Sequence, residues 1–275
     1  MKKRYVALAI LVTCIVGYHI AVAYVDKQLA QRQSALALDY CDKAWSTRGL
    51  VTDSSIRLQQ ANSIDAINLA IDNGAQGVEV DVYFDVELGQ YVVSHDRPYN
   101  LKNGELLSLE KLFAHLQKPI YVWLDFKKLT RLNTEEVAQA VARLTKITTN
   151  TPMVSKVVIE TEHPIKLAAF RDAGFMTMLD TQPLPQSYIG TAFVHNFYKL
   201  VYYFFDFTVM GTNYGELDDP VYNAISEQVL RHVPMFIYHV PNDKALITRL
   251  ARMENVQVVL NTEETANAFV LPGCK

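Results

Sequence analysis

The sequence predicts an α/β fold, a closed (β/α)8 TIM barrel, preceded by an apolar N-terminal helix. Segments typical of strands and helices alternate eight times along the chain. The 275 residues suit one barrel of roughly 250 residues with a leader, and 50% of them are hydrophobic, enough for a large core. A nucleotide-binding open sheet is a poor alternative, because no glycine-rich phosphate loop follows the first strand.

Residues 1–25 predict a membrane-directed segment. Basic residues at positions 2–4 precede an almost unbroken apolar run from Tyr5 to Val25. About 20 apolar residues can cross a bilayer, and the positive charges should stay in the cytoplasm. Two interpretations remain open: an uncleaved signal anchor, or a signal peptide cleaved after Ala21-Val22-Ala23. Both place the barrel on the extracytoplasmic, periplasmic side, either membrane-anchored or secreted.

We expect a linker helix over residues 26–42 and the barrel domain over 43–275. The eight expected strands cover residues 43–48, 77–84, 120–125, 156–160, 175–179, 207–211, 234–240 and 256–260. Ser63 and Ser108 are expected N-caps of helices, and a last helix should begin at Thr262. The formal net charge is −3 and basic residues are scattered, which argues against a nucleic-acid partner. The oligomeric state stays open.

Two cysteines lie at opposite ends of the predicted barrel. Cys41 precedes the first expected strand and Cys274 stands near the end of the sequence. Because the first and last strands of a closed barrel are neighbours, these ends should meet. An exported compartment permits disulfides. We therefore hypothesise a Cys41–Cys274 disulfide, with two free thiols as the alternative.

Acidic residues stand where catalytic groups of such barrels lie, at the C-terminal ends of strands. Glu79 and Asp81 are two positions apart in one strand, so both side chains point to the same face. Two carboxylates facing one interior repel each other unless a cation neutralises them. Mg²⁺ or Ca²⁺ fits oxygen ligands. Asp125 and Lys127 repeat this spacing at the end of the third expected strand.

Five motifs in order resemble the glycerophosphodiester phosphodiesterase family. They are Thr47-Arg48-Gly49, Asn62-Ser63, Glu79-Val80-Asp81-Val82, Val92-Val93-Ser94-His95-Asp96 and Asp125-Phe126-Lys127. The family has His-Arg-Gly, Asn-Ser/Thr, Glu-x-Asp-Val, Val-Val-x-His-Asp and Glu-x-Lys at these places. The match covers residues 44–128 and is looser beyond them. The resemblance implies a (β/α)8 barrel that hydrolyses phosphodiesters.

The same resemblance implies roles for particular residues. Glu79, Asp81 and Asp125 would hold Mg²⁺ or Ca²⁺. Arg48 and Lys127 would bind the phosphate of a small-molecule substrate, and His95 would transfer protons.

One departure from the family pattern is serious, because Thr47 replaces the first of two family histidines. Threonine cannot exchange protons near neutral pH. Two functions therefore stay open. One is a divalent-metal-dependent hydrolase of glycerophosphodiesters or related lipid-derived phosphodiesters. The other is a degenerate barrel that binds phosphate or lipid headgroups without turnover.

Three further features are weaker candidates. Glu160 ends the fourth expected strand and is either a pocket residue or an exposed strand end. Tyr238 should face the barrel interior, so His239 should pack outward, with replacement of the missing base as the alternative. The aromatic-rich segment between Gln182 and Phe205 is expected on the active-site side, either as a loop that forms a hydrophobic lip in contact with lipid or as an irregular helix packed on the core.

Overall fold

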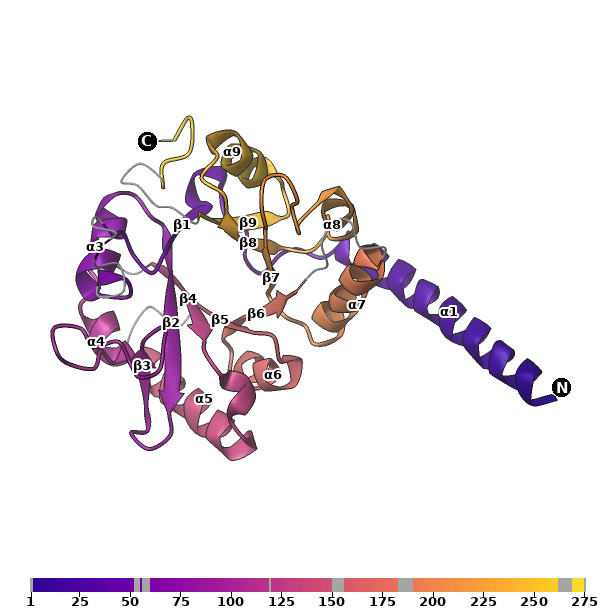
Figure 1. The fold of residues 1–275 in the computed structure, drawn as a ribbon, viewed down its shortest axis with the longest axis horizontal. Helices are drawn as coiled ribbons and strands as arrows, with labels where there is room; N and C mark the ends of the chain where they lie inside the picture. The colour runs from indigo at the N-terminus through magenta and orange to yellow at the C-terminus, as the bar shows by residue number, and fades with distance from the viewer. Residues whose placement is uncertain are drawn as a thin grey trace.

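The computed structural model describes residues 2–51, 55, 60–118, 120–149, 156–182, 190–261 and 269–274. Within these ranges the chain forms the predicted barrel (Figure 1). Eight parallel strands form a closed ring, because β1 pairs with β9 on one side and with β2 on the other. β3 lies outside the ring, antiparallel to β2. The helix expected from Thr262 lies outside the described residues.

Helices and strands alternate around the ring, as the sequence predicts (Figure 1). The strands are β1 (Ala44–Thr47), β2 (Gly77–Asp85), β3 (Gln90–Val93), β4 (Tyr121–Phe126), β5 (Val157–Thr161), β6 (Met176–Thr181), β7 (Val209–Asn213), β8 (Met235–Val240) and β9 (Val256–Asn261). The helices are α1 (Lys2–Leu29), α3 (Ile64–Asp72), α4 (Leu109–Ala114), α5 (Thr134–Thr148), α6 (Pro164–Asp172), α7 (Thr191–Phe204), α8 (Ala224–Val229) and α9 (Lys244–Arg252), with 3-10 turns at Tyr40–Asp42 and Leu129–Arg131.

Local sequence signals explain where several helices begin. The Ser63 hydroxyl accepts a hydrogen bond from the amide of Ala66, and Ser108 does the same for Lys111, so both act as the predicted N-caps. Asn133 and Glu136 form a capping box at the start of α5. Each cap satisfies amide groups that have no partner within the first turn.

Large apolar side chains fill the interior of the ring. Trp45, Trp123 and Phe236 pack together, with ring centroids 5.2 to 5.5 Å apart for the pairs that include Phe236. A Cβ atom on Gly77 would lie 2.2 Å from the Trp45 ring, so only glycine leaves room for that indole. This packed layer closes the barrel interior below the strand ends, where the polar side chains begin.

The N-terminal segment differs from the expected linker helix. α1 continues through the apolar run to Leu29, and residues 32–39 contain no helix before the 3-10 turn at Tyr40. The first half of α1 projects away from the barrel (Figure 1). Among the described residues, α1 is the single helix long and apolar enough to cross a membrane.

The described part of the aromatic-rich segment is a helix, as one of the two alternatives held, and not a loop. Residues 191–204 form α7, a regular helix that follows β6 on the outside of the barrel (Figure 1). Tyr202 is fully buried, as core packing requires, whereas Phe193, Phe197 and Phe204 are exposed. Core packing is thus confirmed for one face of α7, and lipid contact of the exposed face stays a prediction.

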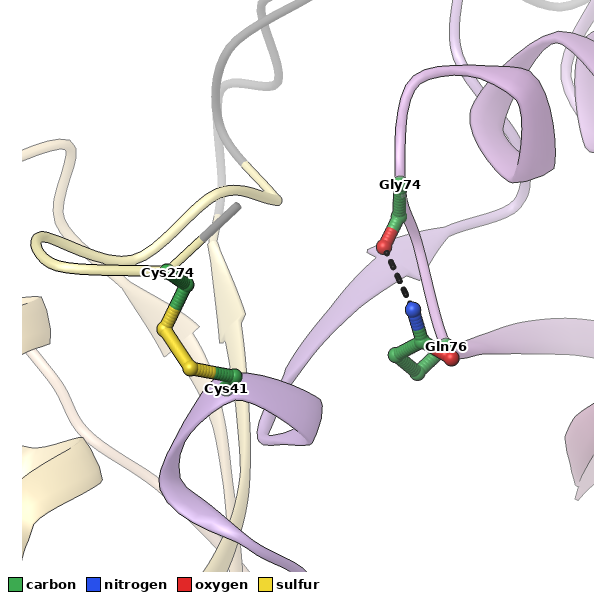
Figure 2. Close-up of a disulfide and its surroundings, with 4 residues drawn as sticks. All are labelled: Cys41, Gly74, Gln76 and Cys274. Atoms are coloured by element: carbon green, nitrogen blue, oxygen red, sulfur yellow. Dashed lines mark hydrogen bonds between the residues drawn. A yellow bond between two sulfur atoms is a disulfide. The ribbon is translucent and has the colours of Figure 1, made fainter.

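The predicted disulfide between Cys41 and Cys274 is present (Figure 2). Their Cα atoms are 5.6 Å apart, although 233 positions separate them in sequence. The bond joins the 3-10 turn before β1 to the segment after β9. It therefore fastens the two ends of the barrel at the place where the ring closes.

We expect loss of this bond to lower stability, because it removes a constraint on the unfolded chain. A disulfide that closes so long a loop contributes about 2–4 kcal/mol. Cys274→Ser should lower the melting temperature measured by circular dichroism. Cys14→Ser is the matched control, since Cys14 is an exposed free thiol. Equal melting temperatures for both variants would contradict this role.

Candidate functional site

The alternation of side chains along parallel strands gathers acidic groups inside one end of the barrel. Asp81 on β2 lies level with Asp125 on β4, which lies level with Glu160 on β5. Glu79 precedes Asp81 by two positions and Asp180 ends the inward row of β6. Asp81, Asp125, Glu160 and Asp180 therefore stand above the aromatic layer, toward the C-terminal ends of the strands, and Glu79 lies one inward position deeper, level with Trp123.

Glu79, Asp81 and Asp125 form the candidate metal centre. One carboxylate oxygen from each residue lies within 4.8 Å of the other two. Oε2 of Glu79 is buried and has no hydrogen-bond partner among the described residues. A buried acceptor without a donor is costly, and a cation would satisfy it. Three converging hard oxygen donors fit Mg²⁺ or Ca²⁺.

Two cationic side chains from other strand ends hold these carboxylates. Nε of Arg48 lies 2.7 Å from Oδ2 of Asp81 and 3.9 Å from Oε1 of Glu79. Nζ of Lys127 lies 2.9 Å from Oδ1 of Asp81 and also contacts Asp125. Arg48 and Lys127 keep 23% and 22% of their side chains exposed, so both also reach the pocket.

An asparagine that the sequence analysis left in a motif without a role orients the central carboxylate. Nδ2 of Asn62 donates to Oδ2 of Asp81 at 2.7 Å, and Oδ1 of Asn62 accepts from the Asp81 amide at 3.1 Å. The Asn62 amide donates to the Arg48 carbonyl. A Cβ atom on Gly49 would lie 2.5 Å from the Ala66 carbonyl carbon, so glycine is required for this turn.

Burial and mutual repulsion shift the acid–base equilibria of the cluster. Burial raises the pKa of Glu79 well above its usual range, and the Asp81 charge raises it further. Burial also raises the pKa of Asp125, although Lys127 opposes this. Partial burial disfavours the charge on Lys127, but the carboxylates of Asp125 and Asp81 outweigh it and raise the Lys127 pKa.

A second acidic group lies beside the first. Glu160 accepts a hydrogen bond from Nε1 of Trp123, and Asp180 accepts one from the Tyr238 hydroxyl at 2.8 Å. Burial raises the pKa of Asp180 to about 7. Glu160 thus lines the pocket and is not an exposed strand end. The sequence analysis missed Asp180, which follows directly after the expected strand 175–179.

Both candidate proton-transfer histidines line the same pocket, which has a volume of about 470 Å³. His95 stands between β3 and α4, with Nδ1 2.8 Å from Oδ1 of Asp96. His239 was expected to pack outward, yet it lines the pocket together with its neighbour Tyr238. Simple alternation fails there because His239 has a left-handed backbone (φ 50°) at a register shift in β8.

Electrostatics favour the neutral form of His239. Partial burial lowers its pKa, and the charges of Arg48 and Lys127 lower it further. Thr47, in the place of the family histidine, also lines the pocket, and its hydroxyl donates to the Asn261 carbonyl at 3.2 Å.

The structure thus brings the predicted site residues to one place. Arg48, Glu79, His95, Asp125 and Lys127 line the pocket. Asp81 is fully buried and touches Arg48, Asn62 and Lys127. The arrangement offers a candidate cation site, two cationic side chains and two histidines around one cavity.

Comparison with known proteins was made by sequence and by structure. No protein-family model and no curated protein matches the sequence. Solved structures do match the fold. A glycerophosphodiester phosphodiesterase from Parabacteroides distasonis superposes with a TM-score of 0.56 at 17% identity, covering 80% of this chain and 93% of that chain.

Two further structures give the same result. A protein from Silicibacter pomeroyi described as a glycerophosphoryl diester phosphodiesterase has a TM-score of 0.57 at 12% identity, covering 86% of this chain and 93% of its own. An Oleispira antarctica phosphodiesterase, solved with the product sn-glycerol-3-phosphate, has a TM-score of 0.53 at 11% identity, covering 82% and 94%. The chain therefore has the barrel fold of glycerophosphodiester phosphodiesterases, as the motifs predicted.

Proposed function

We propose that this protein is a divalent-metal-dependent phosphodiester hydrolase that acts on glycerophosphodiesters or related lipid-derived diesters. The proposal depends on one observation: Glu79, Asp81 and Asp125 converge next to Arg48 and Lys127, two cationic side chains suited to bind phosphate. The barrel fold and the five ordered motifs support it. The exposed apolar helix α1 and the disulfide support an extracytoplasmic location, anchored by α1.

The pocket residues have different roles in the proposed hydrolysis. Arg48 binds the substrate phosphate with its planar fork. Lys127 contacts Asp81 and Asp125 and also lines the pocket, so it would bind the same phosphate. Glu79, Asp81 and Asp125 would hold a divalent cation, which would offset the negative charge that develops on the phosphoryl oxygens. Asp81, oriented by Asn62, holds Arg48 and Lys127 in position before the substrate binds.

Two proton transfers accompany the reaction. An attacking water or hydroxyl loses a proton as its oxygen bonds to phosphorus, and the departing alcohol oxygen gains one as its bond to phosphorus breaks. We assign these transfers to His95 and to His239, which is neutral and able to accept a proton. His239 then supplies the function of the family histidine that Thr47 replaces.

The presence of Thr47 in the place of the family histidine favours the second candidate, a barrel that binds phosphodiesters or lipid headgroups without turnover. Purified protein separates the two functions. Release of glycerol 3-phosphate from glycerophosphocholine in the presence of Mg²⁺ or Ca²⁺ supports the hydrolase. Tight binding of the intact diester without release supports the binding protein.

Removal of the imidazole at position 95 should abolish turnover but leave metal binding intact. We expect His95→Ala to lower kcat/KM for glycerophosphocholine by roughly 10²–10⁴-fold, the usual contribution of a general acid or base. His115→Ala is the matched control, because His115 is exposed and does not line the pocket. Unchanged turnover in His95→Ala would remove His95 from the mechanism.

The assignment of His239 predicts a rescue. His239→Ala should lower turnover by at least roughly 10²-fold. Adding Thr47→His to that variant should restore much of the activity, because it returns an imidazole to the family position in the same pocket. Full activity of His239→Ala alone would contradict the assignment, whatever Thr47→His does by itself.

Cation binding should stabilise the protein more at about pH 8 than at about pH 5. The pKa values of Glu79 and Asp125 are raised, so their protons are bound at low pH and lost as the pH rises through the raised values. Without a cation, the loss of these protons leaves repelling carboxylates and destabilises the fold. At low pH the bound protons compete with the cation, so the cation stabilises the protein most at high pH. The increase in melting temperature on adding Ca²⁺ or Mg²⁺ measures the effect.

Two variants give this measurement its controls. Asp125→Asn should abolish the cation-dependent increase in melting temperature, because it removes one of the three converging ligands. Glu105→Gln should keep the increase, since Glu105 is an exposed carboxylate paired with Lys111. A full increase in Asp125→Asn would exclude the proposed metal centre.

A further inference from the structure

α7 has one buried face and one exposed aromatic face. Its buried face, with His195, Lys199 and Tyr202, packs on the barrel and α8. On the outer face Phe193, Phe197 and Phe204 are 60%, 54% and 64% exposed. We call these three the aromatic stripe. Large apolar side chains that gather on an exposed surface mark a contact with a partner or a membrane, so the stripe needs a partner.

The stripe continues the apolar surface of α1. The rings of Tyr18 and Phe193 lie 5.1 Å apart, and the Tyr18 hydroxyl donates to the Phe193 carbonyl at 3.4 Å. Further along both helices, the rings of Tyr24 and Tyr203 lie 6.1 Å apart. α1 and α7 therefore run side by side in the same direction, and α1 projects beyond the N-terminal end of α7.

The projecting part of α1 is too short to cross a bilayer alone. Its freely exposed apolar stretch, from Tyr5 to Gly17, is about 20 Å long at 1.5 Å per residue. The hydrocarbon core of a bilayer is about 30 Å thick. A span must therefore reach the turns from Tyr18 to Val25, where Tyr18 and Tyr24 contact α7 and Val25 is fully buried. The neighbouring end of α7 must then enter the membrane surface as well.

Ion pairs mark where this apolar surface ends. Nζ of Lys199, which is 2% exposed, lies 2.6 Å from Oδ1 of Asp26, the first acidic residue after the apolar run. Beyond it Arg32 pairs with Asp206 at 2.6 Å. The half of the stripe with Phe193 and Phe197 lies on the apolar side of these pairs. The Phe204 end lies beside Arg32 and Asp206.

We propose that Phe193 and Phe197 insert into the extracytoplasmic leaflet of the bilayer that α1 crosses. The barrel then rests on the membrane by its α7 side instead of extending from it on a flexible stalk. Because α7 follows β6 in the chain of a closed barrel, its N-terminal end faces the C-terminal end of the strands, the end at which the pocket opens. The pocket is thus held at the level of lipid headgroups. This inference rests on the proposed membrane anchor and not on the proposed hydrolysis.

Depth-dependent quenching of an introduced tryptophan tests the insertion. The full chain is reconstituted in phosphatidylcholine–phosphatidylglycerol vesicles with or without bromine on the acyl chains. The native Trp45 and Trp123 are 1% and 2% exposed and give a constant background. Phe197→Trp should lose most of its added fluorescence in brominated vesicles. Phe204→Trp, at the ion-paired end of the same helix, should lose less.

Two more reporters separate the possible failures. Leu101→Trp, 52% exposed in the segment before α4 on the opposite side of the barrel, should keep its fluorescence (Figure 1). Ile15→Trp in α1 should be quenched. Quenching of Ile15→Trp without that of Phe197→Trp overturns the insertion and leaves the anchor. Quenching of neither overturns both.

A second copy of the chain is the remaining occupant of the stripe. In that case Phe197→Trp would show a blue-shifted emission without bromine quenching. The reconstituted protein would also have a dimeric mass by light scattering. That combination would overturn the proposal in favour of an interface between two copies.

Discussion

Repulsion among buried carboxylates is the constraint that the functional end of this barrel must satisfy. Closure of the ring points Glu79, Asp81, Asp125, Glu160 and Asp180 into one space. Arg48 and Lys127 neutralise part of that charge, Asn62 donates a hydrogen bond to Asp81, and Tyr238 donates one to Asp180. The five carboxylates outnumber the two cationic side chains, and Oε2 of Glu79 has no donor among the described residues. This excess of negative charge is what would attract a divalent cation.

Stability and chemistry occupy different levels of the barrel interior. Trp45, Trp123 and Phe236 form a dense aromatic layer below the acids. The layer also serves the site, because the indole N–H of Trp123 donates to Glu160. The fold tolerates buried charged groups at the strand ends because this layer and the surrounding helices supply the buried apolar surface that stabilises it. The disulfide adds a covalent closure between the first and last strands.

The outside of the barrel is as asymmetric as its interior. α1 and α7 share an apolar surface that ends at the Asp26–Lys199 and Arg32–Asp206 ion pairs. A barrel held by that surface would present its pocket close to the headgroup region. The pocket would then lie close to the membrane from which phospholipid-derived substrates are released. The proposed reaction and the proposed membrane contact thus explain different residues and support one another without sharing observations.

The sequence by itself determined the eightfold alternation, the helix caps at Ser63 and Ser108, and the pairing of Glu79 with Asp81, because these depend on local periodicity and on neighbours a few residues apart. It also indicated the Cys41–Cys274 bond, since closure makes the first and last strands neighbours. Only the tertiary structure decided the rest. His239 enters the pocket because a left-handed residue at a register shift breaks alternation. Asp180 and Asn62 gain their roles from partners 58 and 19 residues away, and the exposed face of α7 depends on where α1 packs. Such contacts form between segments distant in the chain, so no local pattern can encode them.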